Sequence, residues 1–365
     1  MGPGRGARQG VVVTPDSPPR TVVVGDALLP ATVIATALEP VGLDVTASLS
    51  WGPADQAEVD RMALRLEREG PGAESPPEEL WEAVADAEVL VVHYCPVDRR
   101  LLEAAPRLRI LGTCRAGTEN LDVEAARDRR LTVLHVVGRT TEAVSDFAIG
   151  LLLAEARNIA RAHDRLMDGR WDKAFVTSAF TPELRGRTIG IVGFGEIGRA
   201  VARKLEGFRM NRLAYDPFVP DELMRDLDVE PAGLDVLLRR SDFVTLHARG
   251  GEGEPPLLGA EELASMKPTA FLINTARSSL VDTDALIEAL RKRRIAGAAL
   301  DVHDREPMGP DHPLVGLDNV TITPHLASST LDCTEKSPRI LAEDLRRVLR
   351  GEPARYEVDG GGDGS

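Results

Sequence analysis

A glycine-rich turn in the middle of the chain constrains its fold more than any other feature. The motif Gly193-Phe194-Gly195-Glu196-Ile197-Gly198 directly follows the apolar run 188–192 and opens a helical pattern. In such a turn the first glycine allows the tight bend, the second lets the backbone approach a pyrophosphate, and the third lets the helix pack on the strand. The helix N-terminus attracts the phosphate charge. The segment therefore predicts a βαβ unit that binds a dinucleotide through Gly193, Gly195, Glu196, Ile197 and Gly198.

An acidic residue closes the next strand and indicates which dinucleotide binds. The Asp216 carboxylate can accept hydrogen bonds from an adenosine ribose, and its charge repels a ribose 2′-phosphate. No arginine follows directly in Pro217-Phe218 to offset this repulsion. NAD is therefore the predicted cofactor rather than NADP.

Short β-branched runs alternate with longer helical patterns from Arg20 onward, which is typical of a parallel sheet covered by helices. We predict an α/β fold of two doubly wound parallel-sheet domains with a cleft between them. A long helix is predicted over 141–169, a terminal helix over 338–350, and a loop over 67–79. The predicted strands are 21–25, 43–47, 88–93, 108–113, 131–137, 188–192, 212–216, 242–247, 270–275, 295–302 and 320–323.

The bulk composition argues against several classes of partner. A formal charge of −14 disfavours nucleic acid and anionic membranes, which are bound through Lys and Arg. The three cysteines are too scattered for a disulfide framework or a zinc site, and no other cluster has metal-ligand spacing. We therefore expect no metal and a cytoplasmic protein. The terminal segments 1–20 and 357–365 are predicted to be disordered tails without a signal-peptide core.

Reactive side chains fall where the strands of the second half end. In an open α/β sheet, ligands bind beyond the carboxyl ends of the strands. The residues found at or just after these ends are Gly193, Asp216, His247, Arg277, Asp301 and His325. They are predicted to converge on one edge of a sheet.

Four sequence blocks carry a resemblance to a known family. Asn274-Thr275-Ala276-Arg277, the block 300–307 and the block 319–325 resemble, in order, the three signature blocks of the D-isomer-specific 2-hydroxyacid dehydrogenases, a phosphoglycerate dehydrogenase-like family. The block 112–122 resembles the family's substrate-domain loop, whose backbone amides hold the substrate carboxylate. The resemblance covers most of the chain.

The resemblance implies a domain plan and a set of binding residues. It implies a flavodoxin-like substrate domain over 21–137 and 332–356, a Rossmann NAD-binding domain over 138–331, and a homodimer. The partner it implies is a small 2-oxo or 2-hydroxy acid. Further cofactor contacts are expected from His247, Thr275, Ala276, Asp301 and Ser328, and substrate contacts from Arg115, Ala116, Gly117 and Arg277.

The residue types suit hydride transfer to a 2-oxo acid. Arg277 offers a planar, permanently charged fork that binds a carboxylate and polarises a ketone. His325 has an ordinary pKa near neutrality and can give or take the proton of the hydroxyl group. Glu306 is expected to orient the imidazole and favour its charged form. Arg277, Glu306 and His325 are therefore the predicted catalytic residues.

Some alternatives stay open from the residues alone. Arg115 is a second cation that could recognise a phosphate, a phosphonate or a second carboxylate, or could form a salt bridge. An NAD-sensing, corepressor-like binding protein and an NAD-dependent oxidation of phosphite or a phosphonate are competing functions. The glycine-rich, acidic loop 248–256 departs from the family pattern. His303 is expected to have a structural or rim role, and His93, His135, His163 and His312 structural roles.

Overall fold

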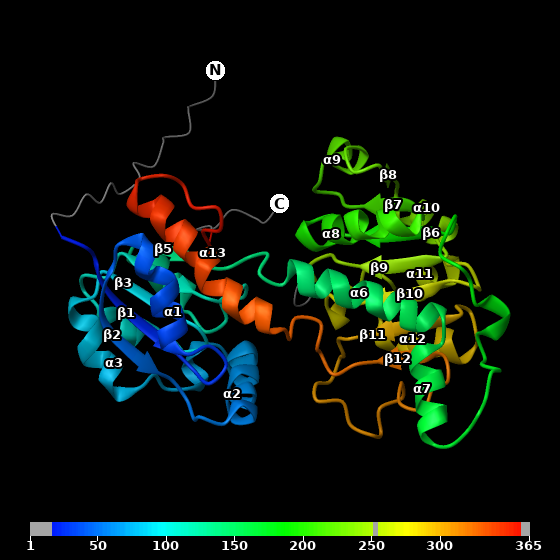
Figure 1. The fold of residues 1–365 in the computed structure, drawn as a ribbon, viewed down its shortest axis with the longest axis horizontal. Coiled ribbons are helices and arrows are strands. Elements are labelled where there is room, and N and C mark those ends of the chain that lie inside the picture. The colour runs from blue at the N-terminus through cyan, green and yellow to red at the C-terminus, as the bar shows by residue number, and fades with distance from the viewer. Residues whose placement is uncertain (1–16, 251–254, 359–365) are drawn as a thin grey trace. The chain divides into compact units, whose positions relative to one another are not determined.

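The computed structural model describes residues 17–250 and 255–358, which form two compact units (Figure 1). Unit 1 contains the chain up to Arg139 and from Thr330 onward, and unit 2 is Thr140–Ser329. Each unit has its own parallel sheet covered by helices. The predicted α/β class, with two doubly wound parallel sheets, is confirmed.

Unit 1 is built on five parallel strands in the order β2-β1-β3-β4-β5. Successive residues of a strand point to opposite faces, and in β3 Leu90 and Val92 pack in one apolar cluster while Val89 and Val91 pack in the other. The strands are β1 (Arg20–Gly25), β2 (Asp44–Ser50), β3 (Val89–Val92), β4 (Ile110–Thr113) and β5 (Thr132–Leu134). The helices are α1 (Ala31–Leu38), α2 (Gln56–Glu69), α3 (Glu78–Ala83), α4 (Arg99–Glu103), α5 (Val123–Asp128) and α13 (Leu331–Leu349).

Unit 2 is built on seven parallel strands in the order β12-β11-β10-β9-β6-β7-β8. The strands on either side of β6 belong to opposite windings, so the end of β6 is the switch point where such folds bind ligands. The strands are β6 (Thr188–Val192), β7 (Asn211–Tyr215), β8 (Glu230–Pro231), β9 (Phe243–Leu246), β10 (Phe271–Asn274), β11 (Gly297–Leu300) and β12 (Val320–Ile322). The helices are α6 (Thr141–Ala156), α7 (Ile159–Met167), α8 (Glu196–Leu205), α9 (Asp221–Arg225), α10 (Leu234–Arg240), α11 (Ala260–Ser265) and α12 (Thr283–Arg291).

The predicted helix 141–169 is wrong as a single element. It is divided into α6 and α7 at Asn158, which has a φ of 56°, a left-handed conformation that asparagine tolerates better than most residues. The Asn158 side chain accepts a hydrogen bond from Thr177 Oγ1 at 2.7 Å. Nearby, the fully buried Glu155 pairs with Arg161 at 2.6 Å. The local ion pair and the contact with Thr177, which is 19 residues away in the sequence, stabilise the break.

Other boundaries differ from the predictions in smaller ways. The terminal helix α13 begins at Leu331 and includes Pro338, and the predicted loop 67–79 contains the end of α2, a short 3₁₀ turn at Pro71–Ala73 and the start of α3. Arg20 is already part of β1, and Val358 N donates to Val133 O at 2.8 Å. Residues 1–16 and 359–365 of the predicted tails, and 251–254 of the loop 248–256, lie outside the described residues.

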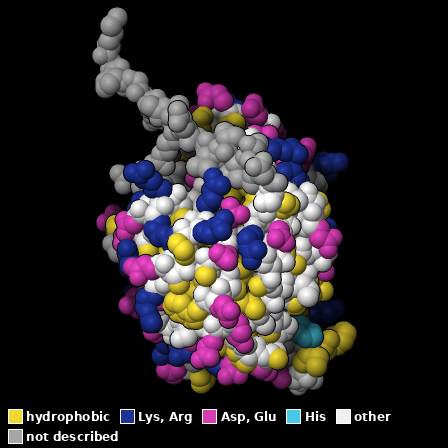
Figure 2. Space-filling model, turned by 90° about the vertical axis from the view of Figure 1, so that its left-hand side faces the viewer, with side chains coloured by type: hydrophobic (Ala, Val, Ile, Leu, Met, Phe, Trp, Pro, Cys, Tyr) yellow, Lys and Arg dark blue, Asp and Glu magenta, His cyan; other side chains and the backbone are white. Residues whose placement is uncertain are grey.

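The distribution of charged side chains and the length of the helices can be compared with the composition. Acidic and basic side chains are interspersed on the face drawn in Figure 2. The net charge of −14 is therefore not gathered into one acidic patch on that face. None of the helices in the described part of the chain is long and apolar enough to cross a membrane.

Candidate active site

The turn between β6 and α8 has the geometry of a pyrophosphate cradle. Gly193 has a φ of 90°, and a Cβ atom there would lie 2.4 Å from the Ala248 nitrogen. A Cβ atom at Gly198 would lie 2.1 Å from the Gly193 oxygen. At Gly195 an added Cβ would meet nothing within 4 Å. The outer glycines are thus required by packing, and the middle one leaves open space beside the backbone, as phosphate binding needs.

Asp216 lies next to this turn. Its carboxylate accepts hydrogen bonds from the main-chain N–H groups of Phe194 at 2.7 Å and Phe218 at 2.9 Å. A carboxylate has about four lone-pair sites, so both oxygens can still accept from ribose hydroxyls. Of the other predicted contacts in α8, Glu196 is exposed and paired with Arg199, and Ile197 is half-buried.

Two buried polar atoms at the same edge of the sheet have no partner. Within residues 17–250 and 255–358, His247 Nδ1 and Thr275 Oγ1 are buried without a hydrogen bond. These residues directly follow β9 and β10, where ligands of such sheets bind. Burial lowers the pKa of His247 to about 3, so its ring is neutral. Because buried polar groups are normally hydrogen-bonded, the cradle and these two atoms fit a bound dinucleotide.

His325 and Glu306 form a close pair. His325 Nδ1 lies 2.8 Å from Glu306 Oε2, and the two side chains are 46% and 23% exposed. The hydrogen bond to Glu306 raises the pKa of His325 above its ordinary value, although partial burial opposes it. Burial alone would raise the pKa of Glu306, but the hydrogen bond with His325 leaves it lowered. The raised pKa of His325 and the lowered pKa of Glu306 both favour a charged imidazolium–carboxylate pair.

The turn that carries His325 is held by Asp301. The Asp301 side chain is fully buried and accepts hydrogen bonds from Leu326 N at 2.9 Å, Ala327 N at 2.8 Å and Thr323 Oγ1. His325 itself has a φ of 54°, a conformation that costs about 1–3 kcal/mol in a non-glycine residue. Asp301, predicted to contact the cofactor, thus directs its carboxylate to the backbone beside His325.

Arg277 follows β10 in a turn braced by Asn274. Asn274 Nδ2 donates to the Arg277 carbonyl at 2.8 Å, and Asn274 Oδ1 accepts from Ala276 N at 3.0 Å. The Arg277 side chain is exposed, and its charge acts on His325 against the influence of Glu306. Unit 2 therefore gathers a guanidinium, an imidazole and a carboxylate, which together can bind an anion and move a proton. Ala276 and Ser328 are half-buried.

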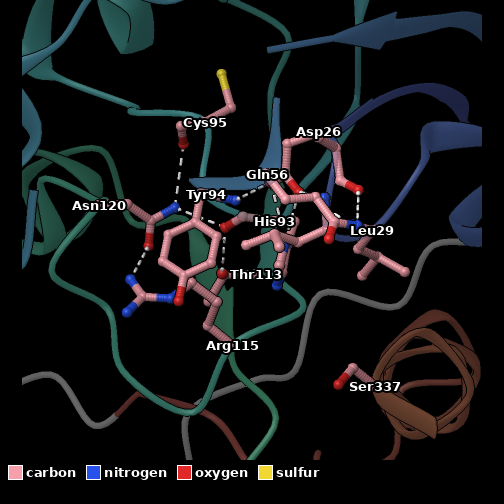
Figure 3. Close-up of polar contacts among 12 residues, drawn as sticks. Asp26, Leu29, Gln56, His93, Tyr94, Cys95, Thr113, Arg115, Asn120 and Ser337 are labelled. Atoms are coloured by element: carbon pink, nitrogen blue, oxygen red, sulfur yellow. Dashed lines mark hydrogen bonds and ion pairs between the residues drawn. The ribbon is translucent and has the colours of Figure 1, made fainter. Parts of the chain in front are cut away.

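Arg115 in unit 1 is already engaged by neighbouring polar and acidic residues, and Figure 3 shows its hydrogen bond to Asn120. The guanidinium lies 2.6 Å from Glu67 Oε1 and 3.3 Å from Glu119 Oε2, and only 5% of the side chain is exposed. It also lies over the Tyr94 ring, 4.2 Å from the centroid. The neighbouring residue Ala116 accepts a hydrogen bond from His135 Nδ1 at 2.8 Å, and a Cβ atom at Gly117 would clash with the Glu119 carboxylate.

The same edge of the unit 1 sheet holds a buried pair that the sequence analysis missed. Asp26 Oδ2 lies 2.8 Å from His93 Nδ1, and Asp26 also accepts from the main-chain N–H groups of Leu28, Leu29 and Tyr94 (Figure 3). Burial lowers the pKa of His93, outweighing Asp26. The available signal was that Asp26 directly follows β1, as His93 follows β3. In the described ranges, no group of three or more His, Cys, Asp or Glu side chains could hold a metal ion.

Comparisons with known proteins agree with this geometry. Residues 149–327 match the family model described as D-isomer specific 2-hydroxyacid dehydrogenase, NAD binding domain. The chain is 40% identical over 284 residues to a glyoxylate reductase of Thermofilum pendens, covering 75% of this chain and 82% of that protein. It is 39% identical over 284 residues to a D-3-phosphoglycerate dehydrogenase of Methanocaldococcus jannaschii, covering 77% of this chain but only 53% of that protein.

A solved structure shares the fold of most of the chain. The TT0316 protein from Thermus thermophilus is similar with a TM-score of 0.68 and 32% sequence identity. The similarity covers 93% of this chain and 100% of that chain. It therefore includes both units.

Proposed function

The chain belongs to the D-isomer-specific 2-hydroxyacid dehydrogenase family and is an NAD-dependent oxidoreductase that acts on a CH–OH group, and from this premise we propose that it interconverts a small 2-oxo acid and the D-2-hydroxy acid. One observation carries the proposal. His325 and Glu306 lie 2.8 Å apart, and the exposed Arg277 acts electrostatically on the same imidazole. A carbonyl reduction needs such a proton donor beside a cation.

The three side chains have distinct roles in the proposed reaction. When bound, NADH would supply the hydride in reduction, and NAD would accept it in oxidation. Arg277 binds the acid and polarises the carbonyl group through its planar fork. His325, in its charged form, donates the proton to the developing alkoxide and takes it back in the other direction. Glu306 orients the imidazole and stabilises its charge.

The cofactor is held by the residues at the edge of the unit 2 sheet. Gly193, Gly195 and Gly198 form the pyrophosphate turn, with Glu196 and Ile197 at the start of α8. Asp216 binds the adenosine ribose. His247 Nδ1 and Thr275 Oγ1, both unpartnered within the described ranges, support contacts near the nicotinamide, where we also place Ala276, Asp301 and Ser328.

The ion pairs that Arg115 already forms favour a small substrate without a phosphate group. Glu67 and Glu119 already neutralise this guanidinium. A phosphoryl or phosphonate group would have to displace a carboxylate that lies 2.6 Å away. We propose that the substrate is a short 2-oxo acid of the glyoxylate type, with its carboxylate held by Arg277. Substrate contacts from the backbone amides of Ala116 and Gly117 stay a prediction.

Assembly and location are further parts of the proposal. Several apolar side chains on and after α7 are exposed, namely Ile159, Leu166, Met167 and Trp171. Exposed apolar patches of this kind often mark interfaces, which supports a homodimer formed through unit 2. Light scattering of the wild-type protein and a Trp171→Ala variant tests the dimer.

The three cysteines are buried free thiols, which supports a reducing, cytoplasmic location.

A substrate panel tests the proposed activity. The protein is mixed with NADH and glyoxylate, hydroxypyruvate, pyruvate or 3-phosphohydroxypyruvate, and the loss of NADH absorbance is recorded. The expected result is the highest kcat/KM with a small unphosphorylated acid, and, in reverse, oxidation of D- but not L-2-hydroxy acids. Tight NADH binding with background turnover for every acid would contradict the proposal and favour a corepressor-like protein. Oxidation of phosphite or a phosphonate by NAD would instead favour the competing function of a phosphite- or phosphonate-oxidising enzyme.

A further inference from the structure

His303 contacts Glu306 directly and also contacts the turn that carries His325. It lies after β11, between Asp301 and Glu306, and is 9% exposed. Its main-chain N–H donates to Glu306 Oε1 at 2.9 Å. Its ring Nε2 lies 2.9 Å from the main-chain oxygen of Thr323. One residue thus reaches the carboxylate and, through a carbonyl group, the turn that carries the imidazole.

The tautomer of this ring follows from its partner. A carbonyl oxygen only accepts hydrogen bonds. Nε2 of His303 therefore carries the ring hydrogen and donates a hydrogen bond to the Thr323 oxygen. The other ring nitrogen, Nδ1, is buried without a partner in the part of the chain that the structure describes. Over those residues, the bond to Thr323 is therefore the ring's single hydrogen bond.

The Thr323 carbonyl is the base of the turn that presents His325. It also accepts the main-chain N–H of His325, at 3.0 Å. His325 has a φ of 54°, in the left-handed region that non-glycine residues adopt only when surrounding contacts hold them there. By fixing the carbonyl to which the His325 backbone is bonded, the His303 ring helps to hold this conformation.

We propose that His303 is a positioning residue that aligns the Glu306 carboxylate through its main chain and the His325 imidazole through its ring. In its kinetic part this inference rests on the proposed function. Small displacements of a proton donor lower the reaction rate strongly, because a misplacement of about 1 Å can reduce a rate about a hundredfold. The effect of His303 should therefore appear in kcat rather than in NADH binding.

Two substitutions separate positioning from packing. His303→Phe keeps a planar aromatic ring and the main-chain N–H to Glu306 but removes the donor to Thr323. His303→Gln keeps a donor amide at a similar reach. We expect kcat for the 2-oxo acid to fall about tenfold to a hundredfold in His303→Phe, with the KM for NADH unchanged, and most of the loss to be recovered in His303→Gln.

His312→Phe is the matched control. His312 is buried in the same segment, but it bonds Asp304 Oδ1 at 3.0 Å and the Leu314 main chain instead of the acid–base pair. This variant should lose stability and keep the wild-type kcat. Equal losses of kcat in His303→Phe and His303→Gln, accompanied by equal losses of Tm, would overturn the proposal and assign His303 a packing role.

A titration that needs no turnover completes the test. The pKa of the His325 imidazole is measured by NMR on histidine-labelled protein, with His325→Ala to assign the resonance. The charged groups that act on His325 are Glu306, Asp301 and Arg277. We expect a lower pKa in His303→Phe than in wild type, recovery in His303→Gln and no change in His312→Phe. The same pKa in His303→Phe and wild type would overturn the proposal, whereas the expected shift in a protein that reduces no 2-oxo acid would defeat only the proposed function.

Discussion

The carboxyl edges of the two sheets both carry polar side chains, but they use them differently. In unit 1, Asp26 is paired with His93 and Arg115 with Glu67; Asp26, His93 and Arg115 are buried, and Glu67 is 38% exposed. In unit 2, Arg277 is exposed and His325 is 46% exposed. The comparison teaches that a polar cluster at a strand edge is not by itself a site of chemistry. The unit 1 groups satisfy one another, and the unit 2 groups remain available to a ligand.

The largest expected effect comes from removing the proton donor of unit 2. His325→Ala should lower kcat by about two to four powers of ten, the range of general acid–base catalysis. The affinity for NADH, measured by fluorescence titration, should hardly change because the pyrophosphate turn is intact. Turnover close to that of wild type would leave unit 2 without its proposed donor.

Removal of the exposed cation should be nearly as costly. Arg277→Leu should reduce kcat/KM by about two to three powers of ten, as for the loss of a group that stabilises developing charge. Arg277→Lys should recover part of the loss, since lysine keeps the charge but not the planar fork. Arg239→Leu, which removes an exposed arginine paired with Asp235 on α10, is the control and should leave the rate unchanged.

Disruption of the buried pair in unit 1 should affect stability instead of chemistry. Asp26→Ala leaves His93 and three main-chain N–H groups without their acceptor, and each buried donor left unsatisfied costs about 1–3 kcal/mol. Urea unfolding measures this loss. Asp122→Ala, which removes the N-cap of α5 in the same unit, should cost only about 1 kcal/mol. An equally small effect for Asp26→Ala would remove the contrast between the two edges.

The smallest expected effect concerns cofactor choice. Asp216→Asn removes the charge but keeps the shape of the side chain that braces the glycine turn. NAD should bind about tenfold more weakly, as expected for a weakened hydrogen bond from a charged group, and NADP should bind better. Asp221→Asn, at an exposed acid paired with Arg225, is the matched control. Unchanged affinities for both dinucleotides in Asp216→Asn would contradict the ribose contact.

Local sequence patterns predicted the regular parts of both units well. Strands β6 and β7, the glycine turn and the helix after it follow from hydrophobic periodicity and turn chemistry, which act over a few residues. The family blocks indicated the membership that the comparisons confirm and the NAD cofactor. The positions of Arg277, Glu306 and His325 at one edge of a sheet could be inferred because parallel strands end on the same side.

Features that depend on distant partners could not be predicted. The division between α6 and α7 rests on Asn158 and Thr177, and the two-residue strand β8 is too short to show a period. The engagement of Arg115 depends on Glu67, which is far away in the sequence. The capping of the His325 turn by Asp301 likewise requires two separate segments to fold together.

The pH dependence of 2-oxo acid reduction tests the central claim, that Glu306 and His325 act as a proton-donating pair, most directly. Reduction needs the charged imidazole, so kcat/KM should stay constant at low pH and fall as the pH rises through the pKa of His325, which Glu306 raises above its ordinary value. Glu306→Gln removes the charge that supports the imidazolium, and the fall should therefore begin at lower pH. Profiles that coincide in wild type and Glu306→Gln would contradict the account.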